Sequence, residues 1–209
     1  MGTELERPTA EEPAPPRLRV TKGSPWRIDA RRRAKLYAEE FIAANAAEIR
    51  QIGDPVLHAP ARKPRLSKAH LEELVGRMFA SMVAAQGLGL AAPQIGVPLR
   101  ICIMDVDAAG IVAVNPEVQW TSGEVAETSE GCLSVHGFYG LIERPVVARV
   151  VATDLGGKRF TVEGEQLGAQ CLLHETDHLG GHLYLDRLRS RADLHPVEVG
   201  EAEEAAPSA

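Results

Sequence analysis

The chain has 209 residues, of which 44% are hydrophobic and 25% are charged, and its formal net charge is −6. The composition is typical of a soluble globular protein and excludes a disordered or fibrous chain. The negative charge excludes a nucleic-acid-coating chain, because an acidic surface is repelled by phosphates. Three cysteines are too few for a disulfide scaffold and favour a reducing compartment. With no apolar run of about 18 residues and no signal peptide, the sequence predicts a cytoplasmic protein without membrane or nucleic-acid partners.

The two ends of the chain differ in composition from the rest. Residues 1–28 are predicted to be a disordered leader, because the prolines and glutamates of the first 20 residues cannot build a core. Residues 191–209 are predicted to be a disordered acidic tail. We expect residues 1–20 and about 195–209 to be dispensable for chemistry, and residues 29–190 to form a single domain.

The predicted elements begin with a helix within residues 30–50, where alanines accompany apolar residues at helical spacing. A second helix is expected over residues 68–85, with Ser67 as its N-cap. Short strands follow, separated by glycine, asparagine and proline: residues 101–106, 111–114, 117–121, 146–152 and 159–162. Asp154-Leu155-Gly156-Gly157 predicts a hairpin between the last two strands, and the final strong element is a helix over residues 164–179.

The sharpest motif is His174-Glu175-Thr176-Asp177-His178, in the last predicted helix. Imidazoles at i and i+4 lie one above the other on a helix face, so that two nitrogens can share one metal ion. Glu175 is offset around the helix and can reach a metal-bound water without being a ligand. The stripe that carries the histidines is otherwise apolar, and unpaired buried imidazoles are costly, which favours a metal site over chance spacing.

A catalytic metal site needs a third protein ligand and an open position. A longer zinc-protease motif would require histidine at position 184, which is Tyr184. His182 follows a Gly-Gly helix end and is expected to be solvated, and Cys171 has the apolar neighbours of a core thiol. Cys132, in Glu130-Gly131-Cys132-Leu133-Ser134, lies at a glycine-containing bend where it can present a thiolate and a free N–H. On the residues alone, a buried structural cysteine explains this segment as well as a ligand does.

A third segment is Gly87-Leu88-Gly89-Leu90-Ala91-Ala92-Pro93-Gln94. A dinucleotide-phosphate loop would need a preceding strand and a following helix, whereas here a helix precedes. Small residues around one glutamine fit backbone that approaches a peptide, with Gln94 directed at a carbonyl. Taken alone, the segment is better explained as a plain helix-ending loop.

In this order, the three segments resemble peptide deformylases, whose motifs they match as G-x-G-x-A-A-x-Q, E-G-C-L-S and H-E-x-D-H. The resemblance covers roughly residues 46–190, includes Gly53-Asp54-Pro55-Val56-Leu57, and makes the predicted 29–190 domain catalytic. It implies an α+β fold, in which short antiparallel sheets pack around a central helix carrying the H-E-x-x-H motif, with additional N-terminal helices.

The resemblance also implies a metal site. Cys132, His174 and His178 would bind one divalent ion, Fe²⁺ by the family pattern, with Zn²⁺, Ni²⁺ or Co²⁺ able to substitute. Metal-bound hydroxide would attack the formyl carbon of formyl-methionyl nascent peptides and release formate, with Glu175 as general base and then acid.

The remaining motif residues would bind the substrate. Gln94 and the backbone N–H of Leu133 would hold the oxyanion. By the same resemblance, the substrate peptide would lie along Gly87, Leu88 and Gly89.

The sequence departs from the family pattern at Val135-His136-Gly137, where many members have a proline, and this predicts a different rim of the substrate groove. The acidic tail does not resemble the basic C-terminal helix with which some members dock on ribosomes, so we expect no more than transient proximity to the ribosome. Two alternatives stay open. A zinc endopeptidase would use the same helix without the cysteine and glutamine segments, and a non-catalytic peptide binder would be expected to have lost Glu175 or a ligand.

Overall fold

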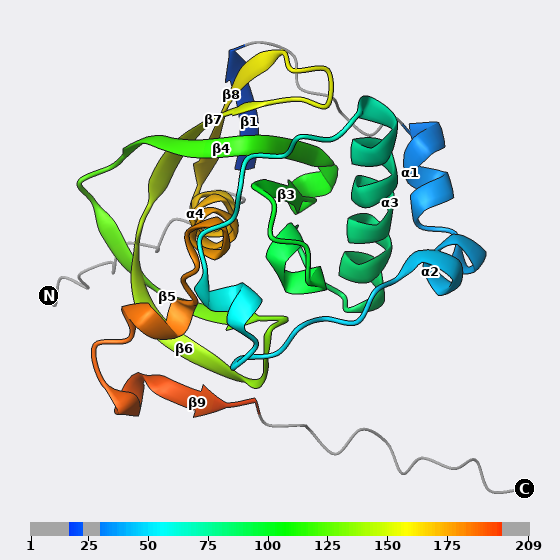
Figure 1. Ribbon diagram of the computed structural model, residues 1–209. Coiled ribbons are helices and arrows are strands. Elements are labelled where there is room, and N and C mark those ends of the chain that lie inside the picture. Colours follow the sequence, from blue (N-terminus) through cyan, green and yellow to red (C-terminus); the bar gives the residue numbers. More distant parts are fainter. Residues whose placement is uncertain (1–16, 23–29, 198–209) are drawn as a thin grey trace, which may run out of the picture.

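The computed structural model describes residues 17–22 and 30–197 (Figure 1). The helices are α1 (Ala30–Leu36), α2 (Glu39–Asn45), α3 (Lys68–Ala84) and α4 (Leu167–Gly180). The strands are β1 (Arg17–Lys22), β2 (Gly89–Ala91), β3 (Ile101–Met104), β4 (Ile111–Thr121), β5 (Val125–Cys132), β6 (Val135–Pro145), β7 (Val147–Thr153), β8 (Arg159–Glu165) and β9 (Leu194–Pro196). None of the helices in this part of the chain has the length and apolarity that crossing a membrane requires.

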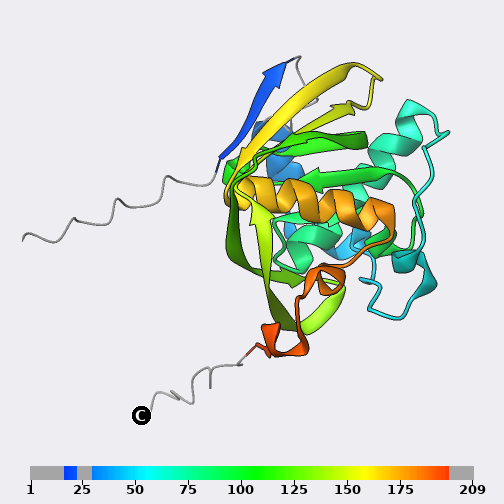
Figure 2. The ribbon, with the colours of Figure 1, turned by 90° about the vertical axis from the view of Figure 1, so that its left-hand side faces the viewer.

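Two antiparallel sheets flank helix α4. The larger sheet has six strands in the order β1-β8-β7-β4-β3-β2, and the smaller has three in the order β5-β6-β9. Figure 2 shows α4 lengthwise, with the larger sheet above it and the smaller sheet below. The α+β class and the central H-E-x-x-H helix predicted from the sequence are confirmed.

Strand β3 divides the core between two helices. Ile101 and Ile103 belong to one buried cluster with the apolar face of α3, whereas Cys102 and Met104 belong to another with Leu172 of α4. This is the period of two that a strand covered on both faces requires. Burial of each aliphatic side chain contributes about 1.5–3 kcal/mol, so packing against the sheet fixes where α4 presents its polar residues.

The two long helices follow the sequence signals. The Ser67 side chain accepts a hydrogen bond from the backbone N–H of His70 at 3.3 Å, which confirms the predicted N-cap of α3. Helix α4 begins at Leu167, later than predicted, because Gly164 continues strand β8 and Gln166 makes the turn with φ of 50°. It ends before Gly181, whose left-handed φ of 82° caps the helix.

Two predicted elements differ in their boundaries. The helix predicted within residues 30–50 is divided into α1 and α2, because the chain turns at Tyr37 and Ala38 is extended. The separate strands predicted at 111–114 and 117–121 form the single strand β4. Its pairing register shifts around Asn115, where φ is 51°, and this irregularity accommodates the following proline.

Both predicted disordered ends are corrected in part. Residues 17–22, placed in the leader, form edge strand β1, which pairs with β8 and buries Leu18 in the core. Residues 191–197, placed in the tail, form a 3₁₀ turn and strand β9, which pairs with β6. Pairing with an existing sheet edge supplies stability that the composition of a short segment does not reveal. The predictions for residues 1–16, 23–29 and 198–209 lie outside the described residues.

Candidate metal and catalytic site

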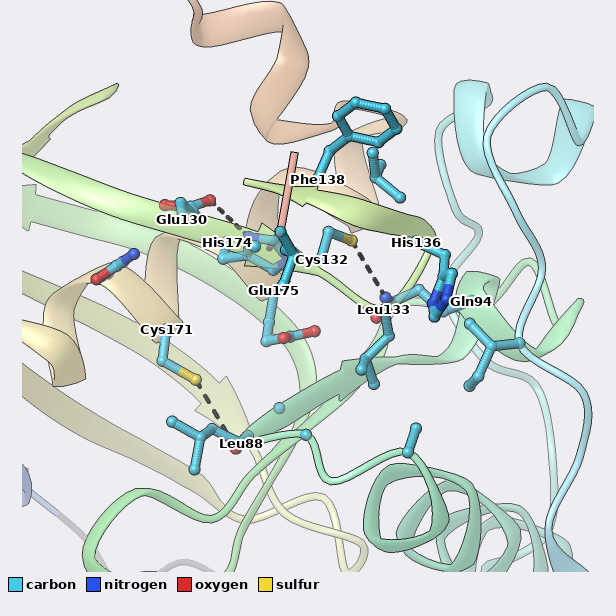
Figure 3. A pocket seen from close by; sticks show the side chains of 18 of the residues that line it. Leu88, Gln94, Glu130, Cys132, Leu133, His136, Phe138, Cys171, His174 and Glu175 are labelled. Atoms are coloured by element: carbon cyan, nitrogen blue, oxygen red, sulfur yellow. Dashed lines mark hydrogen bonds and ion pairs between the residues drawn. The ribbon is translucent and has the colours of Figure 1, made fainter. Parts of the chain in front are cut away.

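The three sequence segments meet around one cavity of about 770 Å³. The segment after α3 leads into β2, Cys132 ends strand β5, and His174 and Glu175 come from α4. In Figure 3 the side chains of these last three residues converge on the same space. The cavity is therefore assembled by the end of one sheet, the edge of the other, and the helix between them.

Cys132, His174 and His178 form a group that fits one metal ion. Nε2 of His178 lies 3.3 Å from Sγ of Cys132 and 3.1 Å from Nε2 of His174, and the three ligand atoms all lie within 4.8 Å of one another. Tetrahedral coordination with metal–nitrogen bonds of about 2.0–2.1 Å places two nitrogens about 3.3 Å apart, close to the observed spacing. One thiolate and two imidazoles suit zinc or ferrous iron, and a fourth position would serve water or substrate.

A network of charged side chains orients His174 on the side away from the ligand group. Its Nδ1 lies 2.5 Å from Oε1 of Glu130, which directs Nε2 to the ligand group (Figure 3). Arg144 donates to both oxygens of Glu130, at 2.6 and 2.9 Å, and to Asp177 of α4 at 2.8 Å. Burial alone would raise the pKa of Glu130, but the hydrogen bonds with His174 and Arg144 outweigh it and lower this pKa to about 2. Glu130 is therefore a carboxylate that fixes the orientation of the imidazole.

Glu175 is buried beside strand β2. Its side chain is 3% exposed, and Oε2 has no hydrogen-bond partner among the residues that the structure describes. A Cβ at Gly89 would overlap Oε1 of Glu175, so the carboxylate occupies space that the glycine leaves free. Burial raises the pKa of Glu175 to about 7, which suits a group that takes up and releases a proton near neutral pH.

Gln94 has a fixed orientation. The backbone N–H of Ala91 donates to its Oε1 at 2.8 Å, so that Nε2 faces Oγ of Ser134 at 3.3 Å and Sγ of Cys132 at 3.6 Å. The amide nitrogen therefore lies next to the ligand group.

The turn after Cys132 is held over the same cavity. Nε2 of Gln51 donates to the Leu133 carbonyl at 3.0 Å, and Oε1 of Gln51 accepts from the backbone N–H of His136 at 3.3 Å. A Cβ at Gly87 would lie 2.8 Å from Cδ1 of Leu133, so this glycine lets the two segments approach closely. Leu88 and Gly89, like Gly87, line the cavity.

Neither of the two residues rejected as metal ligands belongs to the ligand group, although Cys171 lines the same cavity. Cys171 is buried in the core cluster between α4 and the larger sheet, and its Sγ is 4.0 Å from the Leu88 carbonyl oxygen. His182 is exposed beyond the end of α4, with Nδ1 3.4 Å from Asp186. The predictions of a core thiol and a solvated histidine are confirmed.

A helix that presents two imidazoles and a carboxylate beside a thiolate from a neighbouring strand defines a metal-dependent hydrolase. The chain belongs to the peptide deformylase family: the family model described as polypeptide deformylase matches residues 46–193. It is 40% identical over 140 residues to peptide deformylase 1 of Clostridium acetobutylicum, which covers 67% of this chain and 93% of that relative.

Solved structures of the family have the same fold. The peptide deformylase of Synechococcus elongatus in complex with actinonin gives a TM-score of 0.68 at 34% identity, over 71% of this chain and 82% of that chain. The peptide deformylase of Legionella pneumophila gives 0.67 at 40% identity, over 71% of this chain and 88% of that chain. The resemblance stated from the motifs is confirmed, and the activity of this chain is peptide deformylation.

Sequence reasoning missed the residues that support the site. Glu130 and Asp177 stand inside the recognised motifs, and their signal was a carboxylate within two residues of a candidate ligand. Arg144 had no local signal, because only the pairing of β5 with β6 brings it to Glu130. Phe138 and Val197 also line the cavity, and their place depends on strand β9, which the sequence did not predict.

Proposed function

We propose that this deformylase acts on formyl-methionyl nascent peptides with Glu175 as the proton carrier. When held by Cys132, His174 and His178, a divalent ion lowers the pKa of coordinated water and polarises the formyl carbonyl. Glu175 accepts the proton of the attacking water and delivers it to the amine nitrogen as the C–N bond breaks, giving formate and a free N-terminal methionine. The burial of Glu175 next to the ligand group, in the same cavity, supports this role.

Gln94 and Leu133 are proposed to stabilise the oxyanion that develops on the formyl oxygen. Nε2 of Gln94 and the backbone N–H of Leu133 would donate to it, and such preorganised donors typically contribute about 10²–10³-fold in rate. The fixed amide of Gln94 and the held turn at Leu133 support the assignment. Gly87, Leu88 and Gly89 are proposed to lie along the substrate backbone, since they line the same cavity.

Fe²⁺ is proposed as the physiological ion, with Zn²⁺, Ni²⁺ and Co²⁺ as substitutes, because family resemblance adds this preference to a donor set that suits zinc and iron alike. We expect Cys132→Ala to lose the ion and Cys171→Ala to retain one per chain, as measured by elemental analysis of the purified proteins. Retention by the first variant and loss by the second would make Cys171 the ligand instead.

The proposed substrate also indicates where in the cell the enzyme acts. Formylated nascent chains exist where translation takes place, so we propose a cytoplasmic location and transient proximity to the ribosome. We also propose a single catalytic domain that contains the predicted residues 29–190 together with strands β1 and β9. The free cysteines among the described residues agree with a reducing compartment.

The observation that carries the proposal is the convergence of a Cys-His-His ligand group and a buried glutamate in one cavity. The test is to compare formate release from formyl-Met-Ala with hydrolysis of acetyl-Met-Ala and of an unblocked peptide. We expect only the formyl group to be removed, activity to disappear with a chelator, and Fe²⁺ or Ni²⁺ to restore it. Cleavage of internal bonds in the unblocked peptide would instead indicate an endopeptidase.

A further inference from the structure

One short segment, residues 50–52, contacts both parts of the chain that carry the proposed oxyanion donors. The backbone N–H of Arg50 donates to the Gln94 carbonyl at 2.8 Å. The backbone N–H of Ile52 donates to the Ser134 carbonyl, also at 2.8 Å, in the turn that joins β5 to β6. Figure 1 shows the chain running from α2 past this turn. The 50–52 segment therefore fixes the glutamine and the turn relative to one another.

The side chain of Gln51, in the middle of this segment, spans the turn itself. Its Nε2 donates to the Leu133 carbonyl at 3.0 Å, and its Oε1 accepts from the backbone N–H of His136 at 3.3 Å. Nε2 also donates to the Ile49 carbonyl at 3.3 Å. A flipped amide would place its oxygen against two carbonyl oxygens, so these contacts define a single orientation of the side chain.

The carbonyl that Gln51 holds belongs to the residue whose N–H is the proposed donor. Within a residue only φ and ψ are soft, so fixing the carbonyl of Leu133 restricts the direction of its N–H. A donor that is already oriented needs no reorganisation when negative charge develops on the substrate. Both N–H groups of the Gln51 amide are used by backbone carbonyls, so it has none left for the substrate. Any effect of Gln51 on the reaction must therefore pass through the turn.

We propose that Gln51 is a positioning residue, which orients the backbone N–H of Leu133 towards the developing oxyanion. This inference rests on the proposed function, in which that N–H is an oxyanion donor. It gives the 50–52 segment, which supplies none of the proposed catalytic residues, an influence on the rate of the chemical step. Gln51 is exposed, so its replacement leaves no hole in the core and separates this role from the stability of the fold.

The test measures kcat and KM of the full-length, metal-loaded Gln51→Met variant for formyl-Met-Ala. Methionine keeps the length of the side chain and removes both polar groups. Removal of a whole oxyanion donor costs about 10²–10³-fold in kcat, so we expect loss of its orientation to cost about 10-fold. KM should stay close to the wild-type value, because the oxyanion develops only in the transition state.

Two further variants make the result specific to the turn. Gln51→Ala also lacks both hydrogen bonds but cannot fill the space of the side chain, and it should show the same fall in kcat. Gln170→Met is the matched control, because Gln170 also lines the cavity, but its Nε2 donates at 2.9 Å to the Ser129 carbonyl in β5. Its kcat should remain at the wild-type value.

The outcomes separate this inference from the proposed function. If the wild type releases no formate, the proposed function is wrong. If the wild type is active but Gln51→Met keeps its kcat, loses the metal ion, or is impaired only through KM, the positioning role is wrong. The same holds if Gln170→Met lowers kcat as much. A fall in kcat confined to the two Gln51 variants, with KM, metal content and melting temperature retained, supports the role.

Discussion

At the scale of single residues, the position of Glu175 depends on the absence of a side chain at Gly89. Because a Cβ there would overlap the carboxylate, Gly89→Ala should displace Glu175 while leaving the metal ligands in place. A misplacement of about 1 Å can cost about 10²-fold in rate, so we expect a kcat loss of about that size with normal metal content. Gly123→Ala is the control, since a Cβ at Gly123 meets nothing within 4 Å. Full activity of Gly89→Ala would show that the carboxylate does not need this position.

Replacement of Glu175 itself separates catalysis from metal binding. Glu175→Gln keeps the size of the side chain but cannot take up a proton at neutral pH, so we expect kcat to fall by about 10²–10⁴-fold. The ion should remain at one per chain, because Glu175 is not in the ligand group. A metal-free variant would make Glu175 a ligand or a structural residue, and a fully active one would assign the base to another group.

The sequence was sufficient to predict His174, Glu175 and His178 as site residues because their signals are local. The i, i+4 spacing places His174 and His178 on one helix face whatever the rest of the fold does. The choice of Cys132 as third ligand needed the family resemblance, since on the residues alone a structural cysteine was an equal interpretation. The role of Arg144 could not be predicted from the sequence, because its contact with Glu130 exists only across the paired strands β5 and β6.

At the scale of secondary-structure elements, helices and strands that depend on interactions within their own sequence were predicted correctly. Those that depend on pairing with distant segments were not. Helix α3 has an N-cap and an apolar face within its own sequence, and its bounds were predicted closely. Strand β1 and strand β9 are stable only because β8 and β6 offer an unpaired edge. Composition therefore assigned both to disordered ends, and no local pattern could have corrected this.

Because β9 pairs with β6, we expect C-terminal truncations before and after β9 to differ in their effect on stability. A chain that ends at Val197 keeps β9, and we expect its kcat/KM on formyl-Met-Ala to match that of the full chain. A chain that ends at Asp193 loses the pairing with β6 and the half-buried Leu194, a loss of about 1–2 kcal/mol. For a protein of this size the melting temperature should fall by roughly 2–8 °C. Kinetics and thermal unfolding of both chains check this, and equal melting temperatures would show that β9 contributes no stability.

At the scale of the whole molecule, the site exists because α4 is held between two sheets of different character. Its apolar residues pack on the larger sheet, and its polar residues meet the smaller sheet through Asp177, Arg144 and Glu130. The buried Arg144 thus joins α4 to both strands of the β5–β6 pair. Removing one partner of a buried pair typically costs about 3–5 kcal/mol, so this network ties the integrity of the fold to the orientation of a metal ligand.

A second cluster ties the N-terminal helices to the body of the protein and gives the stability a dependence on pH. Asp105, after strand β3, accepts hydrogen bonds from Arg33 of α1 and from the Tyr37 hydroxyl, and its side chain is 6% exposed. Burial alone would raise the pKa of Asp105, but the hydrogen bond from Arg33, followed by that from Tyr37, outweighs it and lowers the pKa from the ordinary value of 3.8.

Because the folded form binds this proton less readily than the unfolded form does, the stabilisation is complete above the unfolded pKa of 3.8 and is lost as the pH falls through the folded value. We therefore expect Asp105→Asn to lower the melting temperature at pH 7 and the difference from the wild type to shrink at pH 3. Measuring both proteins at each pH cancels the titration of the metal ligands, which the two share. Adding Arg33→Met to Asp105→Asn should change little, since their interaction is already lost. A difference between wild type and Asp105→Asn that is equal at both pH values would show that the charge of Asp105 does not hold α1 to the sheet.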